Sequence, residues 1–108
     1  MNFEVEVTSY FKKQAKRLIR KYPSLKGEVD ELISTLMTNP EQGTDLGKGC
    51  YKIRLAIASK GKGKSGGGRL ITHVHVVRQK VYLMSIFDKS EMENLSDGEL
   101  KFLLSFIP

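Results

Sequence analysis

Basic side chains on two neighbouring segments are the residues of this sequence best suited to chemistry on a phosphodiester. Lys52 and Arg54 alternate with apolar residues, so a β-strand would place both on one face. Arg69 follows a loop and opens the next apolar segment, from which it can reach the same region. Cations that converge on one sheet face repel one another unless an anion joins them. We therefore expect the three to bind a scissile phosphate and to stabilise charge that develops on its oxygens.

The loop between these segments, residues 60–68, consists of lysine, glycine and serine. A nucleotide-binding P-loop would require a glycine where Ala58 stands, and a helix after the loop. The following segment alternates like a strand, so the P-loop interpretation fails on both counts. We expect instead a flexible hairpin loop that lays lysines along a nucleic-acid backbone. The lysines predicted to bind this backbone are Lys60, Lys62 and Lys64 in the loop and Lys48 before the strand.

The distribution of charge supports a polyanionic or acidic partner. The chain has 18 Lys and Arg against 12 Asp and Glu, a net charge of +6. Residues 8–27 contain seven basic residues and no acid, and residues 46–87 contain nine basic residues and no acid. Segregation of this kind creates a positive field over part of the surface.

Other classes of site find little support in the sequence. Cys50 is the only cysteine, so an internal disulfide is excluded, as expected for a reducing cytoplasm. It is explained better as a small core or loop residue than as a nucleophile. His73 and His75 lack further ligands at metal-binding spacing, so we expect neither a metal nor another cofactor. No apolar run approaches the roughly 20 residues of a membrane helix, and the acidic start does not resemble a signal peptide.

The first half of the chain is expected to supply one strand and two helices. Residues 3–7 alternate apolar and acidic side chains, which predicts a half-buried strand. Thr8 or Ser9 can cap a helix that continues to Tyr22, and Pro23 ends it. A second apolar stripe runs from Leu25 to Met37, so the two helices should form an antiparallel hairpin.

The second half is expected to form strands at residues 51–58, 69–77 and 80–87, followed by a short helix. That helix begins with Ser96 and Glu99 in a capping box, which explains Glu99 better than a catalytic role does. Three strands with short connections favour an antiparallel meander to which the first strand is added. The prediction is one α+β domain over residues 1–108. Its antiparallel sheet of about four strands packs on the helix hairpin.

Three segments together carry a resemblance to a known family. They are CYKIRL at residues 50–55, Arg69-Leu70 after the loop, and VYLMSIFDKSE at residues 81–91. In this order they resemble the RelE-type ribosome-dependent mRNA interferases, the toxins of type II toxin–antitoxin systems. The lysine–glycine segment at residues 59–67 is similar, more narrowly, to the HigB branch of these toxins.

The resemblance implies a RelE-like fold and a defined reaction. Such toxins enter the ribosomal A site and cut mRNA without a metal, by attack of a ribose 2′-hydroxyl on the neighbouring phosphate. Lys52 falls where it would assist removal of the 2′-hydroxyl proton, and Arg54 and Arg69 where they would hold the phosphate. Lys89 occupies a position at which many relatives place another basic or acid–base residue. The implied partners are a cognate antitoxin, with an acidic toxin-binding segment, and the ribosome with its mRNA in the cytoplasm.

The chain departs from the family pattern at the proton donor. Many relatives carry a tyrosine or histidine near the end of the last strand or in the terminal helix. This chain has FDKS at residues 87–90 and no tyrosine after Tyr82. A member that binds RNA or the ribosome without cleaving is therefore an alternative. A DNA-binding regulator is less favoured, because no helix-turn-helix pattern is present. The candidate proton donors are Asp88, Lys89, His73 and His75.

Overall fold

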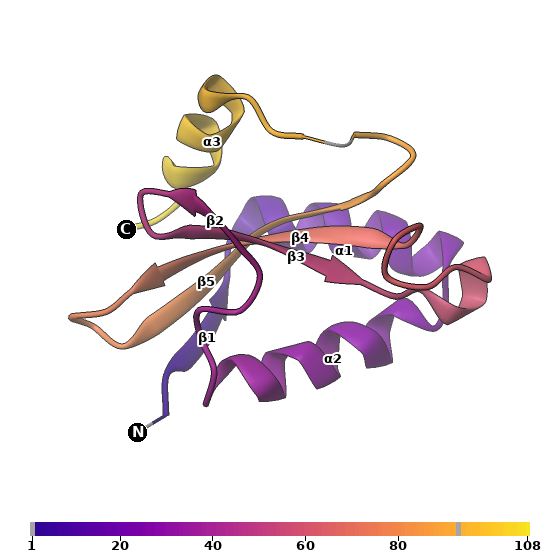
Figure 1. The fold of residues 1–108 in the computed structure, drawn as a ribbon, viewed down its shortest axis with the longest axis horizontal. Helices are drawn as coiled ribbons and strands as arrows, with labels where there is room; N and C mark the ends of the chain where they lie inside the picture. Colours follow the sequence, from indigo (N-terminus) through magenta and orange to yellow (C-terminus); the bar gives the residue numbers. More distant parts are fainter. Residues whose placement is uncertain (1, 93) are drawn as a thin grey trace.

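One mixed sheet, three helices and a short 3-10 turn make up residues 2–92 and 94–108, which the computed structural model describes (Figure 1). None of the helices in this part of the chain is both long and apolar enough to cross a bilayer. The elements are β1 (Glu4–Val7), α1 (Ser9–Lys21), α2 (Leu25–Leu36), β2 (Thr44–Gly47), β3 (Cys50–Leu55), η1 (Ala58–Lys60), β4 (Gly68–His75), β5 (Lys80–Asp88) and α3 (Asp97–Leu104).

The described sheet has five strands in the order β1-β5-β4-β3-β2, where about four were predicted. The additional strand is β2, which sequence patterning missed because Leu46 is its only apolar residue. The prediction of an entirely antiparallel sheet was also wrong, because β1 pairs with β5 in parallel. Alternation of apolar and polar residues identifies a half-buried strand but does not fix the direction of its neighbour.

Two predicted strands end earlier than expected. β3 stops at Leu55, and Ile57 forms only an isolated bridge with Lys62 at the base of the loop. β4 stops at His75, because Val76 and Val77 lie at the tip of the hairpin to β5, where Val77 is 90% exposed. Their β-branched side chains favour a strand locally, but the hairpin turns before they can pair.

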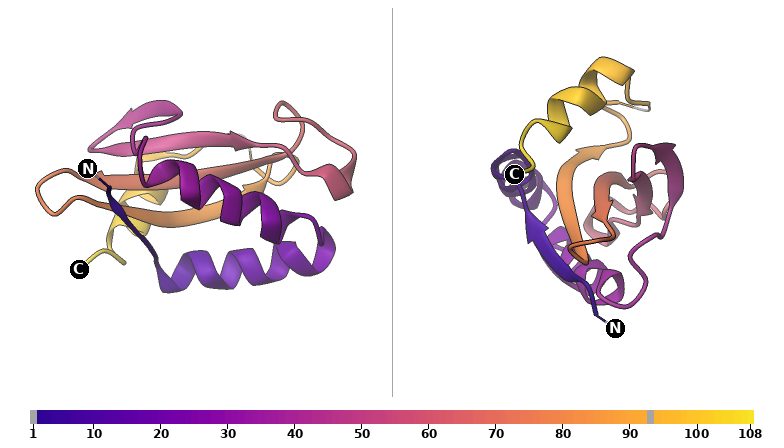
Figure 2. Two further views of the ribbon diagram at one scale, coloured as in Figure 1. Left: turned by 90° about the horizontal axis from the view of Figure 1, so that it is seen from below. Right: turned by 90° about the vertical axis from the view of Figure 1, so that its left-hand side faces the viewer.

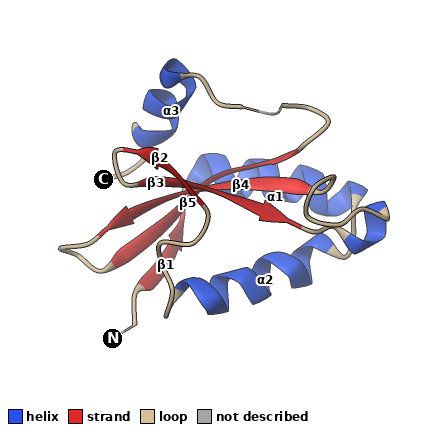
Figure 3. Cartoon of the chain, viewed as in Figure 1, coloured by secondary structure: helices blue, strands red, loops and turns tan. Residues whose placement is uncertain are grey.

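The two faces of the sheet are covered differently. The predicted helix hairpin is present, and α1 and α2 pack on one face around a core that includes Leu18, Leu36 and Leu70 (Figure 2). The opposite face carries a smaller apolar cluster beneath α3, in which Leu100 and Leu103 are buried (Figures 1 and 3). α3 covers only part of that face (Figure 1), and Arg54 near the end of β3 remains exposed.

Both helix starts that the sequence marked are capped as expected. Phe11 N–H donates to Thr8 Oγ1 at 3.1 Å, so Thr8 rather than Ser9 is the cap of α1. Ser96 N–H donates to Glu99 Oε1 at 2.9 Å, and Glu99 N–H donates to Ser96 Oγ at 3.1 Å. The capping box is confirmed, and the Glu99 carboxylate is engaged there.

Close packing at the end of the glycine-rich loop gives a direct test of its conformation. A methyl group on Gly67 would overlap the carbonyl oxygen of Leu55, whereas one on Gly63 would meet nothing within 4 Å. We expect Gly67→Ala to lower the free energy of unfolding by about 2 kcal/mol, because the backbone must shift to relieve the clash. Gly63→Ala is the matched control and should change it by less than about 0.5 kcal/mol. Equal losses in urea denaturation would show that the loop is not packed in this way.

Candidate functional site

The prediction that Lys52 and Arg54 share one sheet face agrees with the strand register. Ile53 and Leu55, which alternate with them, are buried in the helix-side core, so the two cations point to the other face. Arg54 is exposed and Lys52 is half-buried. Neither side chain has a hydrogen-bond or ion-pair partner within the described residues. These cations are therefore available to an external anion.

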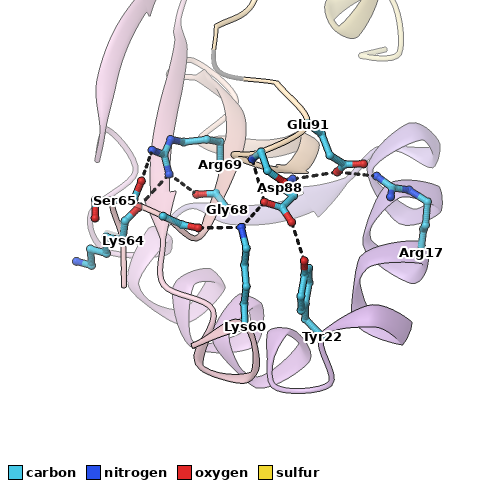
Figure 4. Close-up of polar contacts among 11 residues, drawn as sticks. Arg17, Tyr22, Lys60, Lys64, Ser65, Gly68, Arg69, Asp88 and Glu91 are labelled. Atoms are coloured by element: carbon cyan, nitrogen blue, oxygen red, sulfur yellow. Dashed lines mark hydrogen bonds and ion pairs between the residues drawn. The ribbon is translucent and has the colours of Figure 1, made fainter. Parts of the chain in front are cut away.

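Arg69 lies on the same sheet face as Lys52 and Arg54, but its side chain is not exposed beside theirs. It lies directly across from Arg54 in the β3–β4 ladder, yet it is only 5% exposed. Its Nη1 donates to the carbonyl oxygens of Lys64 and Gly68 at 3.0 and 2.9 Å, and its Nη2 donates to that of Ser65 at 3.2 Å (Figure 4). This buried, hydrogen-bonded Arg69 differs from the predicted arrangement, in which three cations are open to one phosphate. A folded glycine-rich loop leaves carbonyl groups without partners, and a guanidinium with five N–H donors satisfies them.

Lys60, which was predicted to bind RNA, is also turned inward. Its Nζ donates to Asp88 Oδ1 at 2.5 Å and to the Gly66 carbonyl oxygen at 2.9 Å (Figure 4). The side chains of Lys60 and Asp88 are 17% and 1% exposed. Tyr22 donates its hydroxyl proton to Asp88 Oδ2 at 2.8 Å, and Ser90 N–H donates to Oδ1 at 3.0 Å. We call Tyr22, Asp88 and Lys60 the latch.

The latch removes Asp88 from the candidate proton donors. Burial alone would raise the pKa of Asp88, but hydrogen bonds from Lys60, the Ser90 N–H and the Tyr22 hydroxyl outweigh it. The pKa of Asp88 is therefore held well below the usual range of a carboxyl group. At neutral pH this group is an ionised carboxylate with no proton to give.

The remaining loop lysines keep their side chains in solvent. Lys62 and Lys64 are exposed, and neither side chain has a partner among the described residues. Lys64 and Arg54 line a groove of about 410 Å³ between β3 and α2, whose other lining residues include Glu28 and Glu31. These carboxylates disfavour a phosphate inside the groove itself. We call the solvent-facing cations of β3 and the loop the cationic surface; it comprises Lys52, Arg54, Lys62 and Lys64.

The other two predicted cations lie at different distances from this surface. Lys48 is exposed in the turn between β2 and β3, with a φ of 56°. It precedes β3, whose first residue Cys50 lies about 13 Å along the strand from Arg54. Lys89 is half-buried beside the loop, where its N–H donates to the Gly67 carbonyl oxygen at 3.0 Å. The structure therefore places Lys89, and not Lys48, next to the loop.

The two histidines lie toward the other end of β4. His75 is six residues from Arg69, or about 20 Å along the strand, and its Nδ1 accepts from Arg78 N–H. His73 stacks on Tyr82 and lies 3.7 Å from Cys50 Sγ. Burial, with repulsion from His75, lowers the pKa of His73. Of the four candidate proton donors, the two histidines lie away from the loop and Asp88 is an ionised carboxylate. Lys89 is the candidate that remains beside the loop.

Cys50 has the surroundings of a core residue. It is fully buried, and burial raises the pKa of its thiol to about 11. The reactive thiolate is therefore scarce at neutral pH.

We expect the Cys50 thiol to resist alkylation by iodoacetamide at mildly alkaline pH while the chain is folded. Complete labelling should follow unfolding in guanidinium chloride, because the sulfur then reaches solvent and its pKa returns toward about 8.5. Mass spectrometry after timed quenching measures both states. Rapid stoichiometric labelling of the folded chain would contradict the buried placement.

The latch is the part of the site that sequence reasoning missed. One signal was present: Asp88 ends a stretch of 42 residues without an acid, directly after a run of apolar strand residues. An acid in such a place requires a cationic partner when it is buried. Its partner could not be read from the sequence, because Lys60 and Tyr22 are 28 and 66 positions away.

Comparison with known proteins relates the whole described architecture to one group. Residues 5–106 match the family model described as the RelE toxin of the RelE/RelB toxin–antitoxin system. A free-state mutant of the Escherichia coli toxin RelE superposes with a TM-score of 0.63 at 16% identity, covering 100% of both chains. The isolated E. coli toxin gives 0.62 at 15% identity, covering 97% of this chain and 99% of that one. The toxin–antitoxin complex RelBE2 from Mycobacterium tuberculosis gives 0.59 at 14%, covering 82% and 99%.

Proposed function

Because this chain belongs to the RelE toxin family, we propose that it is a ribosome-dependent mRNA endoribonuclease that acts in the cytoplasm as one toxin domain, residues 1–108. The observation that carries the proposal is the pair of outward-facing cations on β3. Lys52 and Arg54 share one face, lack partners within the described residues and stand beside a lysine-bearing loop. Fixed cations of this kind stabilise charge on a phosphate during transfer.

The proposed reaction needs only groups of the chain and the RNA. The ribose 2′-oxygen bonds to the adjacent phosphorus while the bond from phosphorus to the 5′-oxygen breaks. Lys52, as a neutral amine, accepts the 2′-hydroxyl proton, and Arg54 binds the non-bridging oxygens as their charge grows. Lys89 supplies the proton to the leaving 5′-oxygen. The products are a 2′,3′-cyclic phosphate and a 5′-hydroxyl.

We infer an antitoxin as the protein partner of this toxin. The relative from M. tuberculosis was solved as a toxin–antitoxin complex. The net charge of +6, concentrated in two acid-free stretches, favours an antitoxin whose binding segment is acidic. The lysine–glycine loop further favours a place in the HigB branch of these toxins.

A second candidate is a family member that binds the ribosome or RNA without cleaving. It is favoured by one observation, that no tyrosine follows Tyr82 and that Tyr82 itself is only 3% exposed. This candidate predicts tight, salt-sensitive ribosome binding together with intact mRNA.

Induction of the chain in bacteria tests the proposal. We expect growth to stop and translated messages to be cut within codons, as mapped by primer extension. A message whose start codon has been changed is the matched control and should stay intact, because cleavage requires a ribosome. Ribosome binding with no cut in either message would replace the nuclease by the non-cleaving candidate.

A further inference from the structure

We propose that Lys60 is a positioning residue, which holds the segment 61–68 in one conformation so that Lys62 and Lys64 offer fixed charges to RNA phosphates beside Arg54. This inference rests on the proposed function, and it reverses the role that composition suggests for Lys60. The ordinary expectation for a lysine–glycine segment is a mobile arm in which every cation meets the phosphate backbone.

The first support is the latch at the start of the segment. Lys60 joins Asp88 and the Gly66 carbonyl oxygen, so one ammonium group ties the segment both to the end of β5 and to itself. Tyr22 holds the second carboxylate oxygen of Asp88 from the end of α1. A buried carboxylate with these partners is costly to separate from its cation. Lys60 is therefore unavailable to RNA while the segment is folded.

The second support is Arg69 at the other end of the segment. Its guanidinium donates to three carbonyl oxygens, those of Lys64, Ser65 and Gly68. These bonds close the segment around a buried cation that the β4 backbone holds in place. Arg69 and Lys60 thus satisfy carbonyl groups that a mobile loop would leave to water.

Further hydrogen bonds from backbone amides anchor both ends of the segment. Ala58 N–H donates to Glu28 Oε2 at 2.9 Å, and Ser59 N–H donates to Ser24 Oγ at 2.9 Å, which fixes the segment's entry to α2. At the exit, Lys89 N–H donates to the Gly67 carbonyl oxygen. The segment is therefore anchored to α2 and β5 as well as to itself.

A fixed segment strengthens phosphate binding through entropy. A mobile loop loses conformational entropy when RNA immobilises its lysines and backbone. A loop that is already folded in the unbound state loses less, so RNA binding is stronger. Release of the latch should weaken RNA binding without removing a phosphate contact. Removal of Lys62 should remove a contact without releasing the segment.

Two measurements on the full-length chain separate these roles. Hydrogen exchange reports the order of the segment through the amides of Lys62, Gly66 and Lys89. Binding of a short single-stranded oligouridylate over a range of salt concentrations counts phosphate contacts through the slope of log K against log salt. The variants are Lys60→Met, which removes the charge and keeps the length, and Lys62→Met, which changes the net charge equally from the same segment.

For Lys60→Met we expect exchange at these amides to rise about tenfold and oligouridylate affinity to fall about tenfold, with an unchanged salt slope. For Lys62→Met we expect unchanged exchange and a slope smaller in magnitude by about 0.7, the value for one contact with single-stranded RNA. Lys60→Arg keeps a cationic donor toward Asp88 and should retain wild-type exchange and affinity. Far-UV circular dichroism verifies that each variant is folded.

A reduced salt slope for Lys60→Met with unchanged exchange would overturn the proposal, because Lys60 would then be a direct phosphate ligand. Unchanged exchange and unchanged affinity would overturn it as well. The exchange measurement needs neither RNA nor a ribosome. If the wild-type chain binds no RNA while Lys60→Met still releases the segment, the nuclease proposal fails and the anchoring of the segment by Lys60 stands.

Discussion

Replacing Lys52 and Arg54 together by alanine is expected to lower the rate of mRNA cleavage at least about 10³-fold and to abolish growth arrest on induction. Each cation is proposed to act on the reacting phosphate, where loss of one electrostatic partner typically costs about 10²-fold or more. The two act as a unit, so their losses need not multiply. Single-turnover cleavage on programmed ribosomes gives the rate.

The control for this pair is Lys13→Ala with Lys16→Ala, which removes the same charge from the exposed side of α1. Its cleavage rate should stay within a few-fold of wild type. Because Lys52 and Arg54 bond to no other described side chain, their replacement should leave the unfolding transition almost unchanged. Full activity in the folded double variant would remove these residues from the mechanism.

Asp88→Ala is expected to lower the free energy of unfolding by about 3 kcal/mol, because it leaves Lys60 largely buried without its carboxylate. For a chain of 108 residues this corresponds to a fall in Tm on the order of 10 °C. Thermal unfolding followed by circular dichroism measures the change. The control is Asp30→Ala, whose ion pair with Lys26 is exposed and should contribute less than about 1 kcal/mol.

The same group should give the wild-type chain an acid-sensitive stability. The folded-state pKa of Asp88 is lower than its unfolded value, so the unfolded chain binds the proton more tightly. The stabilisation is complete above about pH 4 and is lost as the pH falls further toward the folded-state pKa. In Asp88→Asn this loss is absent, so its unfolding free energy should depend less on pH in that range. Equal acid dependence in both chains would assign the effect to other carboxylates.

Much of the fold follows from local patterns that the sequence displays. The helix hairpin depends on two apolar stripes separated by Pro23, and α3 depends on the Ser96–Glu99 capping box, so both are visible in short segments. Strand β2 has no such pattern. It exists because backbone groups of β3 offer it a partner, as in the pairing of Asp45 with Tyr51.

The sequence predicted the sheet face of each site residue on β3 and β4, because side chains alternate between the two faces of a strand. Lys52 and Arg54 share a face because side chains alternate along any strand. Arg69 obeys the same parity, but the path of its long side chain depends on carbonyl groups that only the folded loop brings near. Lys60 likewise finds Asp88 through tertiary packing. A count of cations therefore overestimates how many remain available to RNA.

Primer extension on a defined message, carried by purified ribosomes and incubated with the purified chain, tests the central claim most directly. The proposed function predicts cuts within the codon at the A site, dependence on the ribosome, and loss of these cuts in the Lys52→Ala, Arg54→Ala variant. The claim would be contradicted if the wild-type chain bound the ribosome but left the message intact. It would also be contradicted if the double variant cut the message as well as the wild type does.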